Sequence, residues 1–193
     1  MNIKGIIKLS AVLLLVTGLW ACGPDIKTEP QDFQLAGQKI VFAPPPDTWN
    51  RQDNKAEKAD PKGGEPAVLR YISKADPDQF VSVASVSFGD MTGWSQDPKK
   101  TEEVVRSLQN QILKRSEAKI IKQEQTTLSG EDALQLTYTY LEGTTRTWGS
   151  QVYAFHDKKL WNISCSCAEK SQSETEAVLK HILKTFKFKD AEK

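Results

Sequence analysis

Hydrophobic and polar residues alternate along several short segments of the chain, the pattern expected of β-strands with one buried face. The clearest segment lies at 133–141, where Leu134, Leu136, Tyr138 and Tyr140 alternate with polar residues. Other short runs rich in β-branched and aromatic residues predict strands at 38–43, 67–72, 80–88, 120–127, 146–155 and 159–167. Turn-forming pairs such as Ser129-Gly130 separate the later runs and indicate hairpins.

Two segments repeat their apolar residues at helical spacing instead. The first, at about 98–116, follows Asp97-Pro98, which pairs an N-cap acceptor with a proline at the first helical position. The second, at about 171–186, places Val178, Ile182 and Phe186 on one side. The order of elements predicts an α+β fold, with a mainly antiparallel sheet of six to seven strands and helices packed on it.

The N-terminus has the pattern of an export signal. Lys4 and Lys8 precede an apolar run at 9–20, which Ala21 and Cys22 follow. The run is shorter than the roughly 20 residues that a helix needs to cross a bilayer. A cysteine directly after a small residue can accept diacylglycerol through its thiol. We therefore predict a lipoprotein signal peptide at 1–21 and a lipidated Cys22; the alternative is an ordinary secretory signal beside an incidental cysteine.

The predicted mature chain divides into a tether and one domain. Residues 22–37 are rich in proline and polar residues, which favours a flexible tether. About fourteen such residues at ~3.4 Å each would reach up to about 50 Å when extended. The domain is predicted at 38–193, with a charged loop at 51–66.

Charge and composition exclude some classes of function. Without Lys4 and Lys8, the mature chain has 24 basic and 25 acidic residues and is nearly neutral. A general nucleic-acid binder or a polybasic membrane-surface protein needs a clear excess of lysine and arginine. After Cys22 the chain contains no second apolar span, so the lipid is the predicted contact with the membrane.

Two further cysteines lie two positions apart, at Cys165 and Cys167, within a predicted strand. Their side chains should share one face of the strand, as small core thiols or as a disulfide or redox-active pair. A disulfide would need a local kink, because Cα atoms two apart in a strand lie at the upper limit for a bridge. With His156 and His181 as the chain's histidines, no ligand spacing predicts a metal site, and we expect no cofactor.

No catalytic constellation is recognisable. Gly93-Trp94-Ser95 lacks the second glycine of a nucleophile elbow, and neither histidine lies in a context that suggests a triad. We therefore predict a protein that is not an enzyme. Trp49, Trp94 and Trp148 occur near element ends, where tryptophan either packs at the edge of the core or contributes to an interface or ligand cleft.

Several local motifs resemble the PsbP-like family, which includes photosystem extrinsic proteins and bacterial envelope lipoproteins. They are Phe42 with Pro46-x-x-Trp49, the central amphipathic helix, the stretch from Gly130 to Tyr138, and Leu160-Trp161-Asn162-Ile163 leading to a helix that ends in Thr185-Phe186-Lys187-Phe188. The resemblance implies an α/β/α sandwich and a binding or assembly role without shared catalytic residues. The segment 51–66 and the thiols at 165 and 167 are not part of this pattern.

Three hypotheses for function follow. The first is a lipid-anchored binding or assembly module on the periplasmic side of a Gram-negative envelope, with an envelope protein as partner. The second is a small-ligand carrier or sensor with an aromatic-lined pocket, and the third is an envelope thiol-redox protein that uses Cys165 and Cys167. Gly23 follows Cys22 where an aspartate would favour the inner membrane, so we expect the outer membrane. Oligomeric state does not follow from the sequence.

Overall fold

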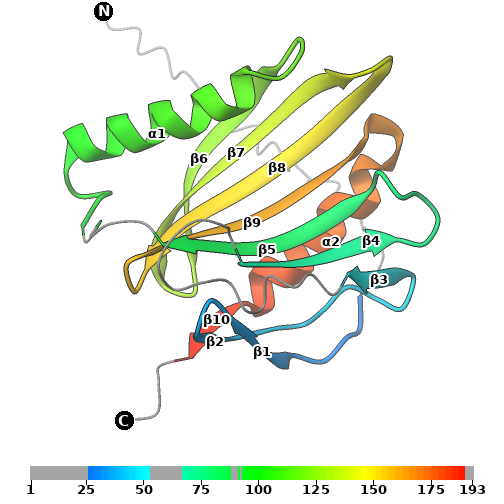
Figure 1. Cartoon of the computed structure of the whole chain (residues 1–193), viewed down its shortest axis with the longest axis horizontal. Helices are drawn as coiled ribbons and strands as arrows, with labels where there is room; N and C mark the ends of the chain where they lie inside the picture. Colours follow the sequence, from blue (N-terminus) through cyan, green and yellow to red (C-terminus); the bar gives the residue numbers. More distant parts are fainter. Residues whose placement is uncertain (1–25, 53–66, 88–90, 92, 190–193) are drawn as a thin grey trace, which may run out of the picture.

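Seven strands pair side by side into one curved antiparallel sheet (Figure 1). They are β3 (Trp49–Gln52), β4 (Ala67–Ser73), β5 (Phe80–Ser87), β6 (Lys119–Leu128), β7 (Glu131–Glu142), β8 (Thr145–His156) and β9 (Lys159–Ala168). Their spatial order is β3-β4-β5-β9-β8-β7-β6, so β6 to β9 form consecutive hairpins and β9 joins them to β5.

The structure is a computed structural model that describes residues 26–52, 67–87, 91 and 93–189. The predicted signal peptide, Cys22 and most of the predicted loop at 51–66 lie outside these residues. Within the described part, no helix is long and apolar enough to cross a membrane.

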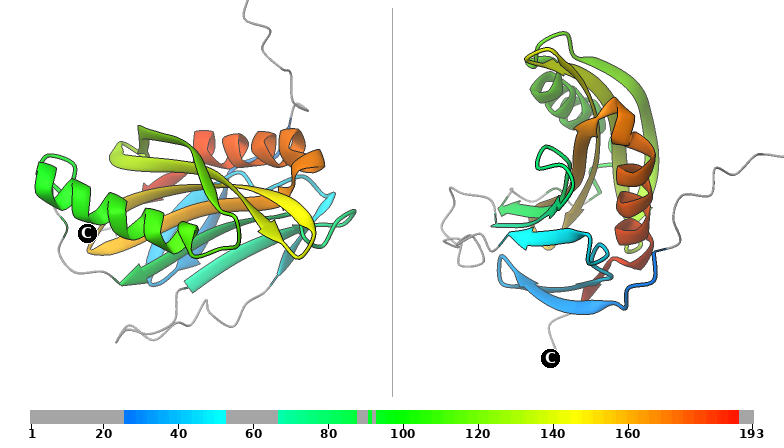
Figure 2. Two further views of the ribbon diagram at one scale, coloured as in Figure 1. Left: turned by 90° about the horizontal axis from the view of Figure 1, so that it is seen from above. Right: turned by 90° about the vertical axis from the view of Figure 1, so that its right-hand side faces the viewer.

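One helix lies on each face of the sheet (Figure 2). Helix α1 (Pro98–Leu113) crosses the face formed by β6 and β7, and α2 (Gln172–Thr185) covers the other face along β9. A small sheet of β1 (Gln31–Leu35), β2 (Gln38–Phe42) and β10 (Lys187–Lys189) extends the layer that contains α2. These layers confirm the predicted α+β fold with a mainly antiparallel sheet.

The alternation in β7 explains how the sheet buries two cores. Leu134, Leu136, Tyr138 and Tyr140 are buried on the α1 face, together with Leu108 and Ile112 of that helix. The larger core lies on the α2 face and includes Val152, Trp161, Ile163, Val178, Leu179 and Ile182. Successive side chains of a strand point to opposite faces, so β7, β8 and β9 contribute to both cores.

The start of α1 is the cap that the sequence predicts. The Asp97 carboxylate accepts hydrogen bonds from the backbone N–H groups of Lys99 at 3.0 Å and Lys100 at 3.3 Å. Pro98 occupies the first turn, where its missing N–H leaves no hydrogen bond unmade. Local sequence therefore determines where this helix begins.

The folded part begins earlier in the chain than expected. Strand β1 lies within the segment 22–37 that the composition predicts as a tether, and its residues Phe33 and Leu35 are buried. Strands β3 and β10 are likewise absent from the sequence-based prediction. Each of these strands has five residues or fewer and forms because β2 or β4 offers a partner, which local patterning does not reveal.

Gly149 in β8 is required by a close contact across the sheet. A Cβ atom at this position would lie 2.7 Å from Cζ and 2.9 Å from the hydroxyl oxygen of Tyr138, which is paired with it on β7. We expect Gly149→Ala to lower the free energy of unfolding by about 1–3 kcal/mol, the usual cost of overpacking. Chemical denaturation would measure this loss.

A double-mutant cycle tests the cause of that loss. In a Tyr138→Ala background the ring is gone, so the additional effect of Gly149→Ala should nearly disappear. An equal loss in both backgrounds would show that the backbone, and not the ring of Tyr138, requires glycine here.

Candidate functional site

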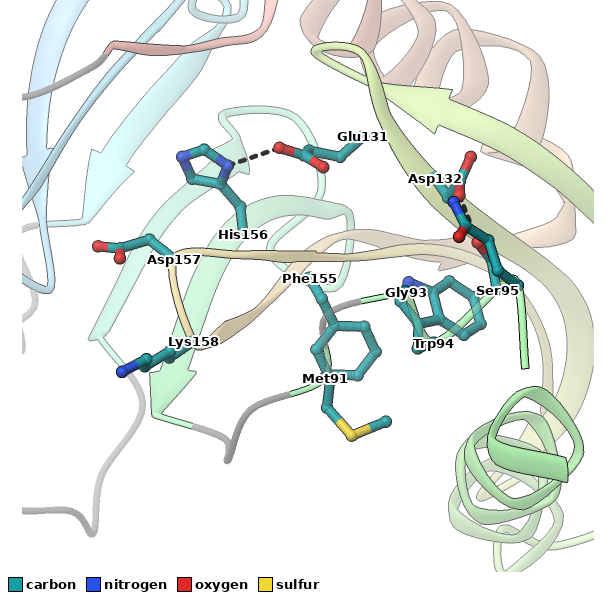
Figure 3. Close-up of a pocket in the computed structure, with 11 residues that line it drawn as sticks. Met91, Gly93, Trp94, Ser95, Glu131, Asp132, Phe155, His156, Asp157 and Lys158 are labelled. Atoms are coloured by element: carbon teal, nitrogen blue, oxygen red, sulfur yellow. Dashed lines mark hydrogen bonds and ion pairs between the residues drawn. The ribbon is translucent and has the colours of Figure 1, made fainter.

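A cavity of about 320 Å³ opens where two hairpins meet the segment that leads into α1. We call it the hairpin pocket. Its walls are formed by Met91, Gly93, Trp94, Ser95 and Gln96 before α1, by Glu131 and Asp132 at the β6–β7 turn, and by Phe155, His156, Asp157 and Lys158 at the β8–β9 turn (Figure 3). Because β7 and β8 are antiparallel neighbours, their two turns lie at the same end of the sheet.

The inner wall of the hairpin pocket is aromatic. Trp94 is 4% exposed, and its ring centroid lies 5.5 Å from that of Phe155. Met91 packs against the same cluster of side chains below α1. Rings held in this way offer a preformed apolar surface to a bound group.

The rim of the hairpin pocket consists of two hydrogen-bonded pairs. The Ser95 hydroxyl donates to the Asp132 carboxylate. Nδ1 of His156 lies 2.9 Å from Oε1 of Glu131, where the imidazole donates and the carboxylate accepts. The His156 ring also stacks on Phe188 of β10, with 3.9 Å between the centroids and 5° between the planes. These contacts hold the polar groups of the rim in place.

The polar groups of the rim do not form a serine–histidine pair. The serine and the histidine contact different carboxylates, so the histidine is not placed to take a proton from the serine. Over the residues that the structure covers, no three His, Cys, Asp or Glu side chains come together as a metal site. The lining has three carboxylates, Glu131, Asp132 and Asp157, and one lysine, Lys158. Asp157 also pairs with the neighbouring Lys159 at 3.6 Å, so Glu131 and Asp132 are the carboxylates that would attract a cationic group.

The three tryptophans that the sequence suggests as binding residues occupy different environments. Trp94 lies in the hairpin pocket, whereas Trp49 and Trp148 are 5% and 3% exposed and belong to the core on the α2 face. The structure therefore does not bring the three together. Only Trp94 lies beside the cavity described here.

Both thiols of β9 are buried on the α2 face. Cys165 is 1% exposed and Cys167 is fully buried, and both are free thiols. Burial raises the pKa of each thiol above its ordinary value, most strongly for Cys165. Because the thiolate is the reactive form, this environment disfavours a redox role and favours core packing.

Glu131, Asp132 and His156 are site residues that sequence reasoning did not single out. The two carboxylates follow the Ser129-Gly130 turn, and local patterning assigns them to a solvated face. The register of β7 and β8 pairs Ala133 with Ala154, which brings the residues just beyond them together. The sequence does indicate both hairpin turns, but only the pairing of β7 with β8 shows that the two turns border one cavity.

The fold and the pocket together define a class of protein: an antiparallel sheet between two helices, with an open pocket at its hairpin end. The family follows from the sequence, which matches PsbP over residues 31–188, and the chain belongs to the PsbP family. No curated protein is a recognisable relative in sequence.

Solved structures of several proteins resemble this fold, and two of them serve as examples. Cyanobacterial PsbP (CyanoP) from Synechocystis sp. PCC 6803 superimposes with a TM-score of 0.54 at 16% identity, covering 89% of this chain and 99% of that one. LpqN of Mycobacterium tuberculosis, described as involved in cell envelope biogenesis, gives 0.51 at 14% identity, covering 84% and 86%. At these identities the likeness establishes the fold alone.

Proposed function

We propose that this chain is a lipid-anchored binding or assembly module of a bacterial cell envelope, without catalytic activity of its own. Two features of the sequence support the location: the export signal at 1–21 and Cys22 at its end. Diacyl or triacyl modification of Cys22, with palmitate among the acyl chains, would anchor the domain durably. Gly23 in the following position favours the outer membrane, with the domain facing the periplasm.

Membership of the PsbP family and likeness to LpqN, which is described as acting in cell envelope biogenesis, support a role in an assembly. The observation that carries the proposal is the hairpin pocket. It has a preformed aromatic wall and a rim of fixed polar groups, and its serine and histidine contact different carboxylates. Such a pocket can hold a side chain of a partner protein. Its excess of carboxylates favours a lysine or arginine of that partner.

The hairpin pocket also gives some support to a small-ligand carrier, because Trp94 and Phe155 form an aromatic wall. A carrier usually encloses most of its ligand, which requires roughly 300 Å³ or more. At about 320 Å³ the cavity is at the low end of that range. We therefore place a protein partner first and a small cationic ligand second.

A photo-crosslinking amino acid in the intact lipoprotein, expressed in its own cells, tests this proposal. Placed at Lys158 it should yield a defined protein adduct, whereas at Thr144, in the β7–β8 turn at the other end of the sheet, it should not. Asp132→Lys should reduce the Lys158 adduct roughly tenfold or more, because like charges facing each other cost several kcal/mol. Asp78→Lys, at an exposed site away from the pocket, is the matched control and should leave it unchanged.

Equal crosslinking from Lys158 and Thr144, or an adduct that Asp132→Lys leaves unchanged, would contradict a binding role for the hairpin pocket. The absence of a protein adduct at Lys158, together with binding of a soluble amine to the purified chain that Asp132→Lys abolishes, would favour the small-ligand carrier instead.

A further inference from the structure

The described chain begins beside α2 and is held against it. Ile26 is partly buried against the core on this face. The Thr28 hydroxyl donates to the carbonyl of Pro44, and its oxygen lies 2.8 Å from Nε2 of His181 in α2. In Figure 2 the start of the described chain lies next to α2, on the opposite side of the sheet from α1. Ile26, which packs against this core, thus comes only four positions after Cys22 in the chain.

This position limits how far the domain can stand from a membrane that holds Cys22. Four residues, even when fully extended, span at most about 14 Å at ~3.3–3.6 Å per residue. That distance is close to the diameter of one helix with its side chains, about 10–12 Å. A lipid on Cys22 would therefore keep Ile26, and the neighbouring part of α2, within about one helix diameter of the phospholipid headgroups.

The charge of this part of α2 fits such a neighbour. After Glu176, the helix contains two exposed lysines, Lys180 and Lys184, and no carboxylate. Lys180 pairs with Glu176 at 2.6 Å, whereas Lys184 forms no ion pair within the described part of the chain. Lys187, in the strand β10 that follows α2, is also exposed, and Glu29 is an exposed carboxylate in the segment that begins at Ile26. Exposed lysines close to a bilayer favour anionic headgroups.

We infer that the exposed face of α2 around Lys180 and Lys184 lies against the anionic phospholipid headgroups, with α1 on the side away from the membrane. The short link from Cys22 to Ile26 imposes this orientation, and the lysines make it favourable. The inference rests on the lipidation of Cys22 that is part of the proposed function. It adds to that function a defined membrane-facing surface.

The intact lipidated chain allows a direct test in vesicles of phosphatidylethanolamine and phosphatidylglycerol that contain a nitroxide-labelled headgroup lipid. A fluorophore is attached at Lys184→Cys on α2 or at Ser107→Cys on α1, both exposed helix positions. Cys165 and Cys167 are buried and Cys22 carries the lipid, so the dye should react at the introduced thiol. Quenching should be severalfold stronger at position 184 than at position 107.

A spacer variant examines the physical cause. A flexible glycine-serine segment inserted after Asp25 lengthens the link, and the difference in quenching between the two positions should then largely disappear. A difference that survives the spacer would overturn the role of the short link.

Vesicle flotation separates the failure of this inference from the failure of the anchor. A chain that floats with its vesicles but is quenched equally at both positions, or more strongly at 107, would overturn the membrane-facing surface and leave the lipid anchor intact. A full chain that does not float would overturn both.

Discussion

Replacing Cys22 by serine should move the chain from the membrane fraction to the soluble fraction of the periplasm. A serine hydroxyl is a much weaker nucleophile than a thiol and does not accept the diacylglycerol group. Each buried methylene of an acyl chain contributes about 0.8 kcal/mol, so losing two or more chains removes the main contribution to membrane binding. Cell fractionation with a high-salt wash, followed by immunoblotting, would measure the change. The wash also removes molecules held only by lysine contacts.

A matched variant keeps the anchor but alters its destination. Gly23→Asp should leave the chain in the membrane fraction and shift it towards the inner membrane in a density gradient. If the Cys22→Ser chain remains with the membranes after the wash, lipidation at this position is not what holds it. If Gly23→Asp changes nothing, the outer-membrane assignment loses its basis.

Trp161→Ala should lower the free energy of unfolding by about 3–5 kcal/mol, the usual loss for truncating a buried aromatic residue. Trp161 is fully buried in β9, and its ring lies 5.2 Å from that of Phe188 and 6.3 Å from that of Phe186. Removing the indole would leave a cavity between the sheet and the segment that follows α2. In a domain of this size, the melting temperature should fall by roughly 6–20 °C.

Trp161→Phe is the matched control for this prediction. The indole N–H of Trp161 is buried and has no hydrogen-bond partner within the part of the chain that the structure describes, which costs about 1–3 kcal/mol in the wild-type chain. Phenylalanine leaves a smaller cavity than alanine and removes this N–H, so we expect a loss of less than about 1.5 kcal/mol. Guanidinium unfolding of the three chains would measure the difference. Equal losses for both variants would mean that the N–H contributes to stability after all.

The main strands and both helices could be predicted because their signals are local. Alternation at 133–141 corresponds to β7, and Asp97-Pro98 starts α1, since side-chain period and capping depend on residues that are close in the chain. Strand β1 has no such signal. Phe33 and Leu35 become core residues because β1 pairs with β2 beneath the end of α2.

The candidate site depended on contacts between distant residues. Glu131 and His156 are 25 positions apart, and Trp94 comes from a third segment. Each of these residues is ordinary in its own local context. The register of β7 against β8 and the path into α1 create the cavity that they share.

By itself, the sequence determined the class of fold and predicted an exported, lipid-bearing chain, because periodicity, capping and the signal at 1–22 depend on residues that are close together in the chain. The tertiary structure decided that both thiols of β9 are buried, that of the three tryptophans Trp94 alone borders the hairpin pocket, and that Ile26, within the predicted tether, packs against the core. These outcomes depend on which segments meet in space. Strand pairing and helix packing determine those meetings, and local residue patterns do not encode them.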